Sequence, residues 1–390
     1  MTTFELRASS AHRSVASASN PNGDNAFGYP MCIGVVGPPE PAVSGVVRFG
    51  AALTESLRAL GYGVDTVELT DELCASGPAR QVPIGESVAS IAAQLNRCDA
   101  VVIQHGYGIY GGTHGDDVLS IIAAVRVPTI AVAHQVLDNP DPHQRWVLER
   151  LVASTDRVVV MSRAAHERLC RDYGVDRAKV VTIPHGGAPS SGPRPKRPSR
   201  PTILTWGLLG PGKGVERVID AMESLKNVPG RPRYVVVGQT NPAEVSVHGE
   251  AYRDARVEQA RQCGVADSVS FDARSYSRAM LTELIQSAAV VVLPYDSTDH
   301  VNSAILAEAI ANGRPVVATA FPHAVELLSS GAGIVVDHDD PDAMAAALRR
   351  VLTQPRLAGE MAAEARRLAP EMAWSTVARA YGALAQRLAS

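Results

Sequence analysis

The chain has 390 residues, of which 46% are hydrophobic and 20% are charged, and its formal net charge at pH 7 is −3. This length fits two domains of ordinary size, and the balance of apolar and charged residues is typical of a soluble globular protein. The small negative charge gives no support for bulk nucleic-acid binding or for a polybasic membrane surface.

The amino-terminal segment carries no sign of a targeting sequence. Residues 1–30 are rich in Ser, Ala and Asn and lack the apolar core of a signal peptide, so we expect a disordered tail. No window reaches the roughly 18 apolar residues of a membrane span. Five cysteines are scattered without a Cys-x-x-Cys pair, which favours reduced thiols in a cytoplasmic protein. They are Cys32, Cys74, Cys98, Cys170 and Cys263.

From residue 31 the chain alternates short apolar runs with patterns of helical period. Strands are predicted at 32–36, 64–69, 100–104, 129–133, 157–161 and 180–183. Helices are predicted at 46–60, 117–124, 145–154 and 163–173. Alternation of β-branched strands with helices predicts a mostly parallel, doubly wound sheet of the α/β class.

Residues 189–201, PSSGPRPKRPSRP, combine proline, glycine and basic side chains and predict a linker between two domains. The alternation then restarts. Strands are predicted at 202–206, 233–237, 268–271, 290–294, 316–319 and 333–336, and helices at 215–225, 251–263, 278–287, 303–312, 341–352 and 374–388. The second half therefore repeats the architecture of the first.

Two glycine-rich loops each follow a predicted strand and precede a helix. Residues 37–45 lack the Gly-x-Gly-x-x-Gly fingerprint of nicotinamide binding. Residues 207–214, GLLGPGKG, nearly complete a phosphate-binding P-loop, but Gly214 stands where that motif needs a hydroxyl to hold magnesium. This substitution argues against a P-loop nucleotide hydrolase, which stays as an alternative.

Residues 290–318 predict a strand, a polar loop, a helix that carries Glu308, and a second strand. The loop lies at the carboxyl end of its strand, where open α/β sheets bind ligands. The start of the helix offers free N–H groups to an anion. The segment therefore predicts a ligand site at this edge of the sheet.

The segment LPYDSTDHVNSAILAEAIANGRPVVAT resembles the donor-sugar site of retaining glycosyltransferases of family 4. In that family two glutamates are separated by seven residues. Glu308 matches the second glutamate, and His300 stands at the position of the first, beside Asp299. Lys213-Gly214 is similar to the end of the family's Gly-Arg-x-x-x-x-Lys-Gly loop, in which Leu208 replaces the arginine.

The resemblance covers roughly residues 31–385 and implies the GT-B architecture, in which two doubly wound Rossmann-like domains face each other across a cleft. It implies an acceptor-binding domain at 31–188, the linker at 189–201 and a nucleotide-sugar domain at 202–373. The last helix, within residues 374–390, is expected to cross back onto the first domain.

The resemblance also assigns the donor contacts. Glu308 is expected to bind the ribose hydroxyls, and Lys213 to hold the diphosphate together with the N–H groups near Ser303. No metal or other cofactor is then required. Asp340-Pro341-Asp342 fits helix capping better than metal binding. The further donor contacts expected are Ser44, Gly45, Gly207, Gly214, Arg274, Asn302 and Ala304.

The resemblance assigns the acceptor to the first domain and gives the transferred sugar one contact from each domain. His134 follows strand 129–133 and is expected near the sugar, and His300 is expected to contact the sugar in place of the missing glutamate. His134, His300 and Glu308 are thus the candidate catalytic residues. The loop at 104–112, QHGYGIYGG, is expected either to bind an acceptor through its aromatic side chains or to have a purely structural role. The candidate acceptor contacts are His105, Tyr107, Tyr110 and Gln135.

The sequence therefore predicts a metal-independent, retaining hexosyltransferase that uses a nucleoside diphosphate sugar, with UDP and GDP as the first candidates. The acceptor is expected to be a small molecule or glycan, and the protein a cytoplasmic monomer or homodimer without a nucleic-acid partner. A GT-B sugar phosphorylase or epimerase, a P-loop hydrolase, and a sugar-nucleotide-binding protein without catalysis are the alternatives.

Overall fold

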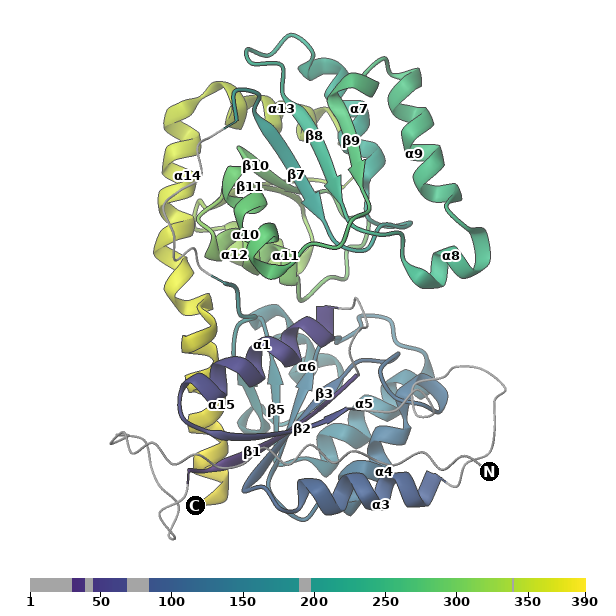
Figure 1. Ribbon diagram of the computed structural model, residues 1–390, viewed down its shortest axis with the longest axis vertical. Coiled ribbons are helices and arrows are strands. Elements are labelled where there is room, and N and C mark those ends of the chain that lie inside the picture. Colours follow the sequence, from purple (N-terminus) through teal and green to yellow (C-terminus); the bar gives the residue numbers. More distant parts are fainter. Residues whose placement is uncertain (1–29, 39–44, 69–83, 189–197, 339) are drawn as a thin grey trace, which may run out of the picture.

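The computed structural model describes residues 30–38, 45–68, 84–188, 198–338 and 340–390, and shows two α/β units, each built on its own sheet (Figure 1). The predicted tail up to residue 29, Ser44, Cys74 and residues 189–197 of the predicted linker lie outside the described residues. We call the units the first and second domain. The predicted GT-B fold of two doubly wound parallel sheets is confirmed.

The first sheet has six parallel strands in the order β2-β1-β3-β4-β5-β6. They are β1 (Cys32–Gly37), β2 (Gly63–Glu68), β3 (Ala100–His105), β4 (Thr129–Ala133), β5 (Arg157–Val160) and β6 (Val180–Thr182). One face packs against α1 (Gly45–Ala59) and α15 (Trp374–Ala389). The other packs against α3 (Ile84–Leu95), α4 (Asp117–Ala124), α5 (Pro142–Ser154) and α6 (Arg163–Asp172).

The second sheet has the order β12-β11-β10-β7-β8-β9, again parallel throughout. Its strands are β7 (Thr202–Trp206), β8 (Arg233–Val237), β9 (Val269–Asp272), β10 (Val290–Leu293), β11 (Val316–Thr319) and β12 (Gly333–Val336). One face is covered by α7 (Val215–Leu225), α9 (Ala251–Gln262) and α13 (Pro341–Thr353). The other is covered by α10 (Arg278–Ser287), α11 (Ala304–Ala311) and α12 (Pro322–Leu328).

Strand β10 shows why the strand sequences are continuously apolar. Val290 and Val292 pack into the core beneath α7 and α13, whereas Val291 and Leu293 pack beneath α10 and α11. All four side chains have no exposed surface. Because helices cover both faces of a parallel sheet, every position of a central strand is buried.

Four helices that the structure describes were not predicted. They are α3, α8 (Pro242–His248), α12 and α14 (Pro355–Leu368). In α8, α12 and α14 a proline stands at the first helical position, where its missing N–H breaks no intrahelical hydrogen bond. The proline therefore opens these helices instead of marking a loop.

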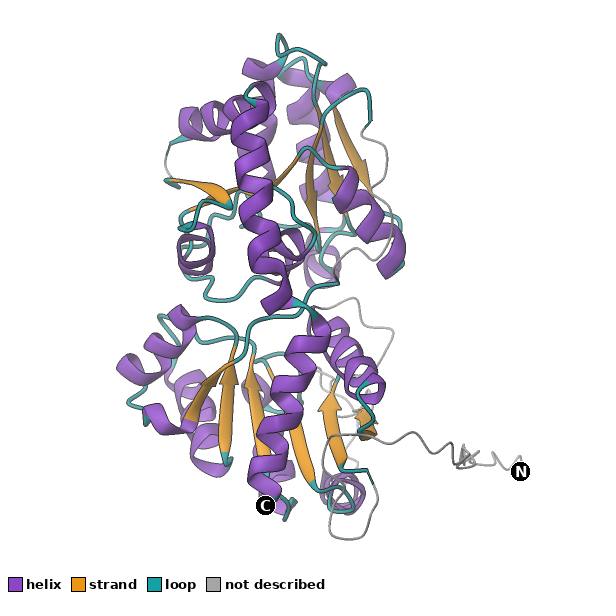
Figure 2. Ribbon diagram, turned by 90° about the vertical axis from the view of Figure 1, so that its left-hand side faces the viewer, coloured by secondary structure: helices purple, strands orange, loops and turns teal. Residues whose placement is uncertain are grey.

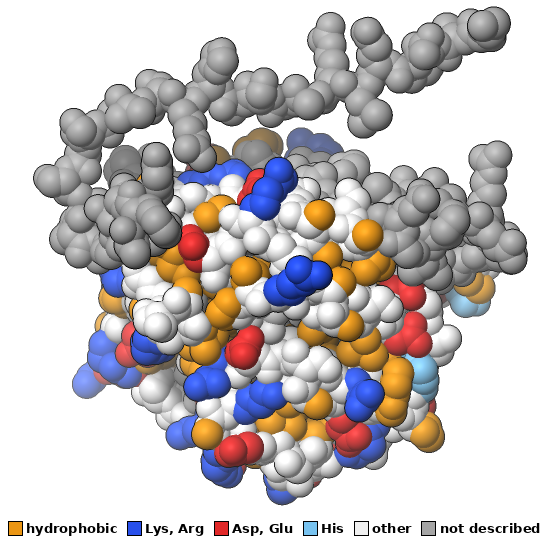
Figure 3. Space-filling view, turned by 90° about the horizontal axis from the view of Figure 1, so that it is seen from below, with side chains coloured by type: hydrophobic (Ala, Val, Ile, Leu, Met, Phe, Trp, Pro, Cys, Tyr) orange, Lys and Arg blue, Asp and Glu red, His pale blue; other side chains and the backbone are white. Residues whose placement is uncertain are grey.

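The two domains are joined at the carboxyl-terminal end as well as at the linker. Helix α14 packs on the second domain and α15 returns to the first, where Val377, Tyr381 and Leu384 enter the core against β1 and β3 (Figures 1 and 2). Within the described residues no helix has the length and apolar content needed to cross a bilayer. At the far end of the first domain, acidic and basic side chains are interspersed over the part not covered by grey atoms (Figure 3).

Candidate active site

Three adjoining cavities form a groove between the domains. The largest, about 900 Å³, is lined by loops that follow β1, β3 and β4 in the first domain and β7 and β10 in the second. It brings His134 of the first domain together with Lys213, His300 and Asn302 of the second. The predicted catalytic histidines and the predicted phosphate-binding lysine therefore share one cavity.

The second and third cavities continue the groove. The second, about 280 Å³, contains Glu308 and shares Gly45, His185 and Ala304 with the largest cavity. The third, about 230 Å³, is lined by Gly207 and shares four residues with the second. Those four are Arg48, Trp206, Tyr276 and Leu281. The groove thus runs from His134 past Glu308 to the glycine-rich loop that follows β7.

The glycine-rich loop is held against the loop that follows β10. The backbone N–H of Asp296 donates to the carbonyl of Gly212 at 3.0 Å, and Lys213 Nζ lies 4.8 Å from the centroid of the Tyr295 ring. Burial lowers the pKa of Lys213. This lysine is therefore half-buried beside an aromatic face and points into the groove rather than into bulk solvent.

The backbone conformation at Gly214 explains why this position departs from the P-loop pattern. Its φ is 64°, in the left-handed region, and a Cβ placed there would lie 1.6 Å from the carbonyl oxygen of Pro294. A serine or threonine cannot take this position without moving the backbone of β10's loop. The geometry therefore excludes the magnesium-binding hydroxyl of a P-loop hydrolase.

Glu308 projects from α11, whose start is fixed by the side chain of Ser303 accepting from the Leu306 N–H. The indole Nε1 of Trp206 donates to Glu308 Oε2 at 3.1 Å. Burial raises the pKa of the Glu308 carboxyl, and the charges of Arg48 and the Trp206 hydrogen bond oppose that rise. The carboxyl therefore lies partly buried at the wall of the second cavity, with one oxygen held by Trp206.

The N–H groups near Ser303 were expected to bind phosphate, and that of Ser303 itself is not available because it donates to Nδ1 of His323 at 2.9 Å. The unpaired N–H groups that every helix start provides then belong to the residues that follow it. Ala304 lines both the largest and the second cavity. Of these two residues, Ala304 rather than Ser303 therefore stays a candidate for binding an anion at the start of α11.

The two candidate catalytic histidines are uncharged near neutral pH. Burial lowers the pKa of His134 to about 3 and that of His300 to about 4, and the nearby Lys213 contributes to the latter. His134 Nε2 forms a hydrogen bond of 2.5 Å with Oε1 of Gln104. Gln104 lies inside the apolar strand β3, and its contact with His134 was not predicted. Both histidines are suited to hydrogen bonding with a sugar and poorly suited to carrying protons.

Two of the predicted acceptor contacts are wrong because the side chains are buried. His105 has no exposed surface and neither ring nitrogen has a hydrogen-bond partner among the described residues. The Tyr110 hydroxyl donates to the carbonyl of Gln104 beneath the loop. Tyr107 does not line the largest cavity, and its hydroxyl is buried as well. Only Gln135, which accepts from the Tyr107 N–H, lines it as expected.

The loop that follows β3 still forms the first-domain wall, but through other atoms. Gly106, Gly108 and Ile109 line the largest cavity, together with Gln135 and Val136. A glycine-rich backbone lets a ligand approach closely where a side chain would fill the space. This part of the first-domain wall is therefore built from backbone, apolar surface and Gln135, and not from the tyrosine rings.

The cations are also distributed differently from the expectation. The Arg274 side chain is 77% exposed, forms an ion pair with Asp272, and lines the third cavity, whereas Lys213 lines the largest. Arg274 is thus not placed to share the diphosphate with Lys213. Arg48, on the first turn of α1, was not predicted; it lines the second and third cavities opposite Glu308. A cation directly after a glycine-rich loop was the available signal.

Two family descriptions match this chain. "Glycosyltransferase Family 4" matches residues 43–187, and "Glycosyl transferases group 1" matches residues 190–368. Curated relatives named D-inositol 3-phosphate glycosyltransferase come from Kineococcus radiotolerans, with 31% identity, and Xylanimonas cellulosilytica, with 30%. Each alignment covers 62% of this chain and 60% of the relative, so the chain spans about 60% of the length of either.

Solved structures share the fold. A glycosyltransferase from Rickettsia africae superposes with a TM-score of 0.71 at 16% identity, covering 92% of this chain and 98% of that one. The Anabaena protein HepE, solved in complex with UDP, superposes with a TM-score of 0.68 at 15% identity, covering 92% of this chain and all of HepE. At these identities the likeness concerns the fold alone.

Proposed function

The chain belongs to glycosyltransferase family 4, and we propose that it moves a hexose from a nucleoside diphosphate donor to an acceptor hydroxyl with retention and without a metal ion. The observation that carries this proposal is the groove between the domains. It places Glu308, Lys213, the start of α11 and two neutral histidines along one path. That sequence of groups matches the sequence of ribose, diphosphate and sugar in the donor.

The donor lies along the groove with its base near Gly207 and Tyr276, in the third cavity. The ribose hydroxyls donate to the free oxygen of Glu308. The diphosphate lies between Lys213 and the N–H groups at the start of α11, and the hexose lies in the largest cavity against His134 and His300. UDP is the first candidate for the nucleotide part of the donor, because the structurally similar HepE was solved with UDP.

Chemistry requires charge stabilisation on the leaving group. The bond between the anomeric carbon and the phosphate oxygen breaks, and negative charge develops on the departing diphosphate. Lys213 and the helix N-terminus stabilise that charge. These groups supply the role that a metal ion has in other transferases.

Retention is favoured because the described lining of the largest cavity offers no free carboxylate that could act as a general base. Among the described residues that line it, the only carboxylate is Asp299, which is held by Arg168. An inverting transfer needs a general base at this place, and the neutral histidines have pKa values too low for that role. The departing phosphate is the remaining base for the proton of the acceptor hydroxyl, so the acceptor attacks from the same face.

The acceptor is proposed to be a small polyol. The first-domain residues that line the largest cavity, within the described ranges, include no lysine or arginine. The curated relatives are named for D-inositol 3-phosphate, so inositol and its 3-phosphate are the first probes. This wall favours the uncharged cyclitol over the phosphate ester.

A binding screen tests the proposal. Thermal unfolding is measured with UDP, GDP, ADP and dTDP, each with EDTA or with magnesium, on wild type and on Glu308→Ala. A ligand at 100 times its Kd adds about 2.7 kcal/mol to the free energy of unfolding. We expect one nucleotide to shift the transition with EDTA present, and the shift to be lost in Glu308→Ala. Glu360→Ala, an exposed glutamate outside the groove, is the matched control.

The opposite results are equally informative. A shift that requires magnesium and survives Glu308→Ala contradicts the proposed donor site. Absence of any nucleotide shift, with binding of inorganic phosphate instead, supports the sugar phosphorylase. If a nucleotide binds, the corresponding glucosyl donor is then incubated with inositol, and proton NMR of the product gives the anomeric configuration.

A further inference from the structure

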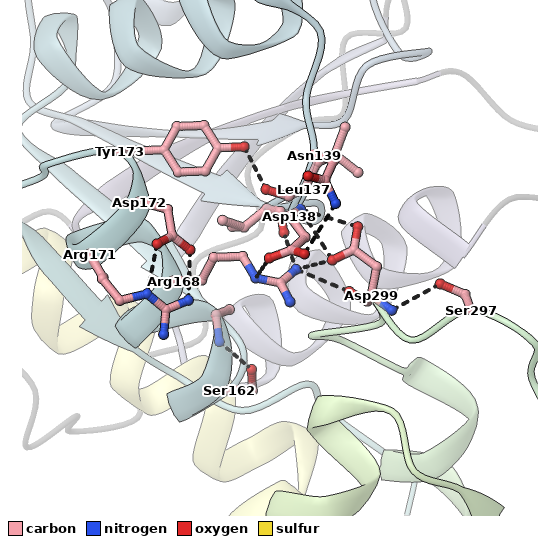
Figure 4. Close-up of polar contacts among 12 residues, drawn as sticks. Leu137, Asp138, Asn139, Ser162, Arg168, Arg171, Asp172, Tyr173, Ser297 and Asp299 are labelled. Carbon is pink, nitrogen blue, oxygen red and sulfur yellow. Dashed lines mark hydrogen bonds and ion pairs between the residues drawn. The ribbon is translucent and has the colours of Figure 1, made fainter. Parts of the chain in front are cut away.

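Arg168 of α6 is a buried cation of the first domain that contacts the donor loop of the second. Its side chain is 9% exposed, and its guanidinium Nη1 donates to the carbonyl of Val136 at 2.9 Å within its own domain. The same nitrogen donates to the carbonyl of Asp299 at 3.2 Å and to the Asp299 carboxylate. Figure 4 shows Arg168 pointing from its helix at Asp299, which comes from the other domain.

The Asp299 carboxylate has a second partner in the first domain. The backbone N–H of Asp138 donates to both of its oxygens, at 3.1 and 3.2 Å (Figure 4). The Asp138 side chain lies 3.8 Å from Arg168 Nε. The Asp299 carboxylate is therefore bound by two first-domain donors, the cationic guanidinium of Arg168 and the neutral backbone N–H of Asp138.

The two residues after His300 are fastened to the first domain as well. Ser162 Oγ donates to the carbonyl of Val301 at 2.5 Å, and the Val301 side chain is buried in the core of the first domain. The Asn302 amide lies 3.0 Å from Met161 Sδ. His300 is thus flanked on both sides by residues whose positions the first domain sets.

The other end of the loop is tied to the second domain. The Asp296 N–H donates to Gly212, and the Asp296 carboxylate lies 2.9 Å from Arg217 Nη2. The loop from 296 to 302 therefore bridges the glycine-rich loop and the first domain. His300 itself contacts the second domain, because its carbonyl accepts from the His323 N–H at 3.2 Å and its ring lies 5.0 Å from that of Tyr295. Its place relative to Lys213 is therefore set by both domains, and loss of the first-domain contacts would leave it held from one side only.

We propose that Arg168 and Asp299 are positioning residues that hold His300 against the transferred sugar. The inference deepens the proposed function and rests on it. It concerns a pair for which the spacing of the family motif gives no role, since Asp299 stands beside the matched position. Nucleotide binding depends on Glu308 and Lys213, which this ion pair does not touch. The pair therefore governs turnover more than nucleotide affinity.

A second interdomain contact provides a matched control. The carboxylate of Glu326, at α12, accepts from the N–H groups of Arg163 and Ala164 at the start of α6, both at 2.8 Å. It joins the same two domains at the same helix but does not touch the loop from 296 to 302. Glu326→Gln therefore reports the effect of weakened domain contact alone.

The experiment compares wild type, Asp299→Asn and Glu326→Gln with UDP and UDP-glucose as probes. We expect Asp299→Asn to keep its Kd for UDP within about twofold and to lower kcat for UDP-glucose consumption by about 10- to 100-fold, because small misplacements of reacting groups cost that much. Glu326→Gln should keep both values. Asp299→Glu, which restores the charge, should recover part of the lost kcat.

A readout without turnover keeps this proposal separate from the proposed function. Hydrogen exchange of the amides at 297–303 is measured in the protein without nucleotide. We expect it to rise in Asp299→Asn and to stay unchanged in Glu326→Gln. If wild type consumes no nucleotide sugar, the proposed function fails. The hydrogen-exchange result still shows whether the contact between Arg168 and Asp299 holds the loop at 297–303. Unchanged exchange in Asp299→Asn, equal loss of kcat in both variants, or a parallel loss of UDP affinity overturns the inference.

Discussion

The second-domain wall of the groove presents charged groups in fixed contacts, whereas the first-domain wall of its largest cavity presents glycine backbone, apolar side chains and uncharged polar side chains. On the second-domain side, Glu308 is held by Trp206 and Lys213 lies against Tyr295. On the first-domain side, the lining includes Gly106, Gly108 and His134. A wall built from charged groups suits the constant, anionic part of a donor, and a wall built from backbone suits an uncharged ligand.

The same difference separates what is rigid from what is adjustable. The glycine-rich loop at 207–214 is locked by its own backbone and by contact with Pro294. The loop at 297–302 belongs to the second domain by sequence but is held by both domains, since Ser162 and Arg168 of the first domain bind it and the His300 carbonyl accepts from the His323 N–H of the second. Substitutions in either wall test this difference, and the expected effects on stability and nucleotide affinity differ in size.

The largest effect is expected from completing the P-loop pattern with Gly214→Ser. The new Cβ meets the Pro294 carbonyl, and the residue must also adopt a left-handed conformation. We expect the free energy of unfolding to fall by more than about 4 kcal/mol, in the range that marks a severe backbone clash. Urea unfolding measures this, and no magnesium-dependent ATP hydrolysis should appear.

Gly212→Ser is the matched control, because Gly212 also has positive φ but a Cβ placed there meets no described atom within 4 Å. It should cost roughly 1–2 kcal/mol, the penalty of the left-handed conformation alone. Equal stability of the two variants, or gained hydrolysis in Gly214→Ser, would contradict the account of this loop.

The next effect is expected at Glu308. Glu308→Ala removes the acceptor for the ribose hydroxyls, and hydrogen bonds to a charged group contribute roughly 1.5–3 kcal/mol each, so UDP affinity should fall about 100-fold. Glu308→Gln retains one carbonyl oxygen and should lose about tenfold on the same scale. Calorimetric titration of UDP gives both values. Affinity that is unchanged in Glu308→Ala would move the ribose elsewhere.

Lys213 and Arg274 were both predicted from the sequence to bind the diphosphate, and substitutions at the two positions should affect UDP affinity differently. Lys213→Ala should weaken UDP by about tenfold or more and leave uridine binding unchanged, because the lost contact is to phosphate. Arg274→Ala should change UDP affinity by less than about threefold, since exposed ion pairs contribute little. The same titrations with UDP and uridine measure this. A larger loss for Arg274→Ala would reverse the assignment.

A further effect, on stability rather than on binding, is expected when the pH is lowered. Burial lowers the pKa of five histidines in the folded state to about 3 or 4, below the unfolded value of about 6.5. The unfolded chain therefore binds more protons between about pH 6.5 and pH 4, and stability is lost as the pH falls through that window. The five are His105, His134, His185, His300 and His323.

His105→Leu sharpens this prediction, because the His105 ring nitrogens have no hydrogen-bond partner in the described part of the chain. Each such histidine contributes up to about 1.4 kcal/mol per pH unit to the slope of stability. Urea unfolding at pH 7, 6 and 5 should show a shallower loss in the variant. An identical slope in both proteins would mean that His105 does not titrate on unfolding.

The sequence predicts the donor wall better than the acceptor wall for a physical reason. Glu308, Lys213 and Gly214 owe their places to local elements, namely one helix after one loop, whose period and glycines are visible in the chain. Whether His105 and Tyr110 are exposed depends on how a loop folds over the sheet. The sequence does not distinguish an aromatic side chain that lines a cavity from one that packs into a core. Nothing local distinguished the two.

Contacts between the domains were out of reach for a similar reason. Arg168 and Asp299 are separated by 131 positions, and each alone reads as a charged residue on a polar surface. Arg48 follows a glycine-rich loop in the sequence, but its place opposite Glu308 depends on how α1 packs across the groove. The strands and most helices, by contrast, follow from hydrophobic period and lie within a few residues of their predicted bounds.

The most direct test of the proposed donor site is a crystal structure of the wild-type protein with UDP in the presence of EDTA. The account predicts ribose hydroxyls within hydrogen-bond distance of Glu308, the diphosphate between Lys213 and the start of α11, and the base near Gly207 and Tyr276. A nucleotide bound outside this groove, or one whose diphosphate avoids Lys213, would contradict it.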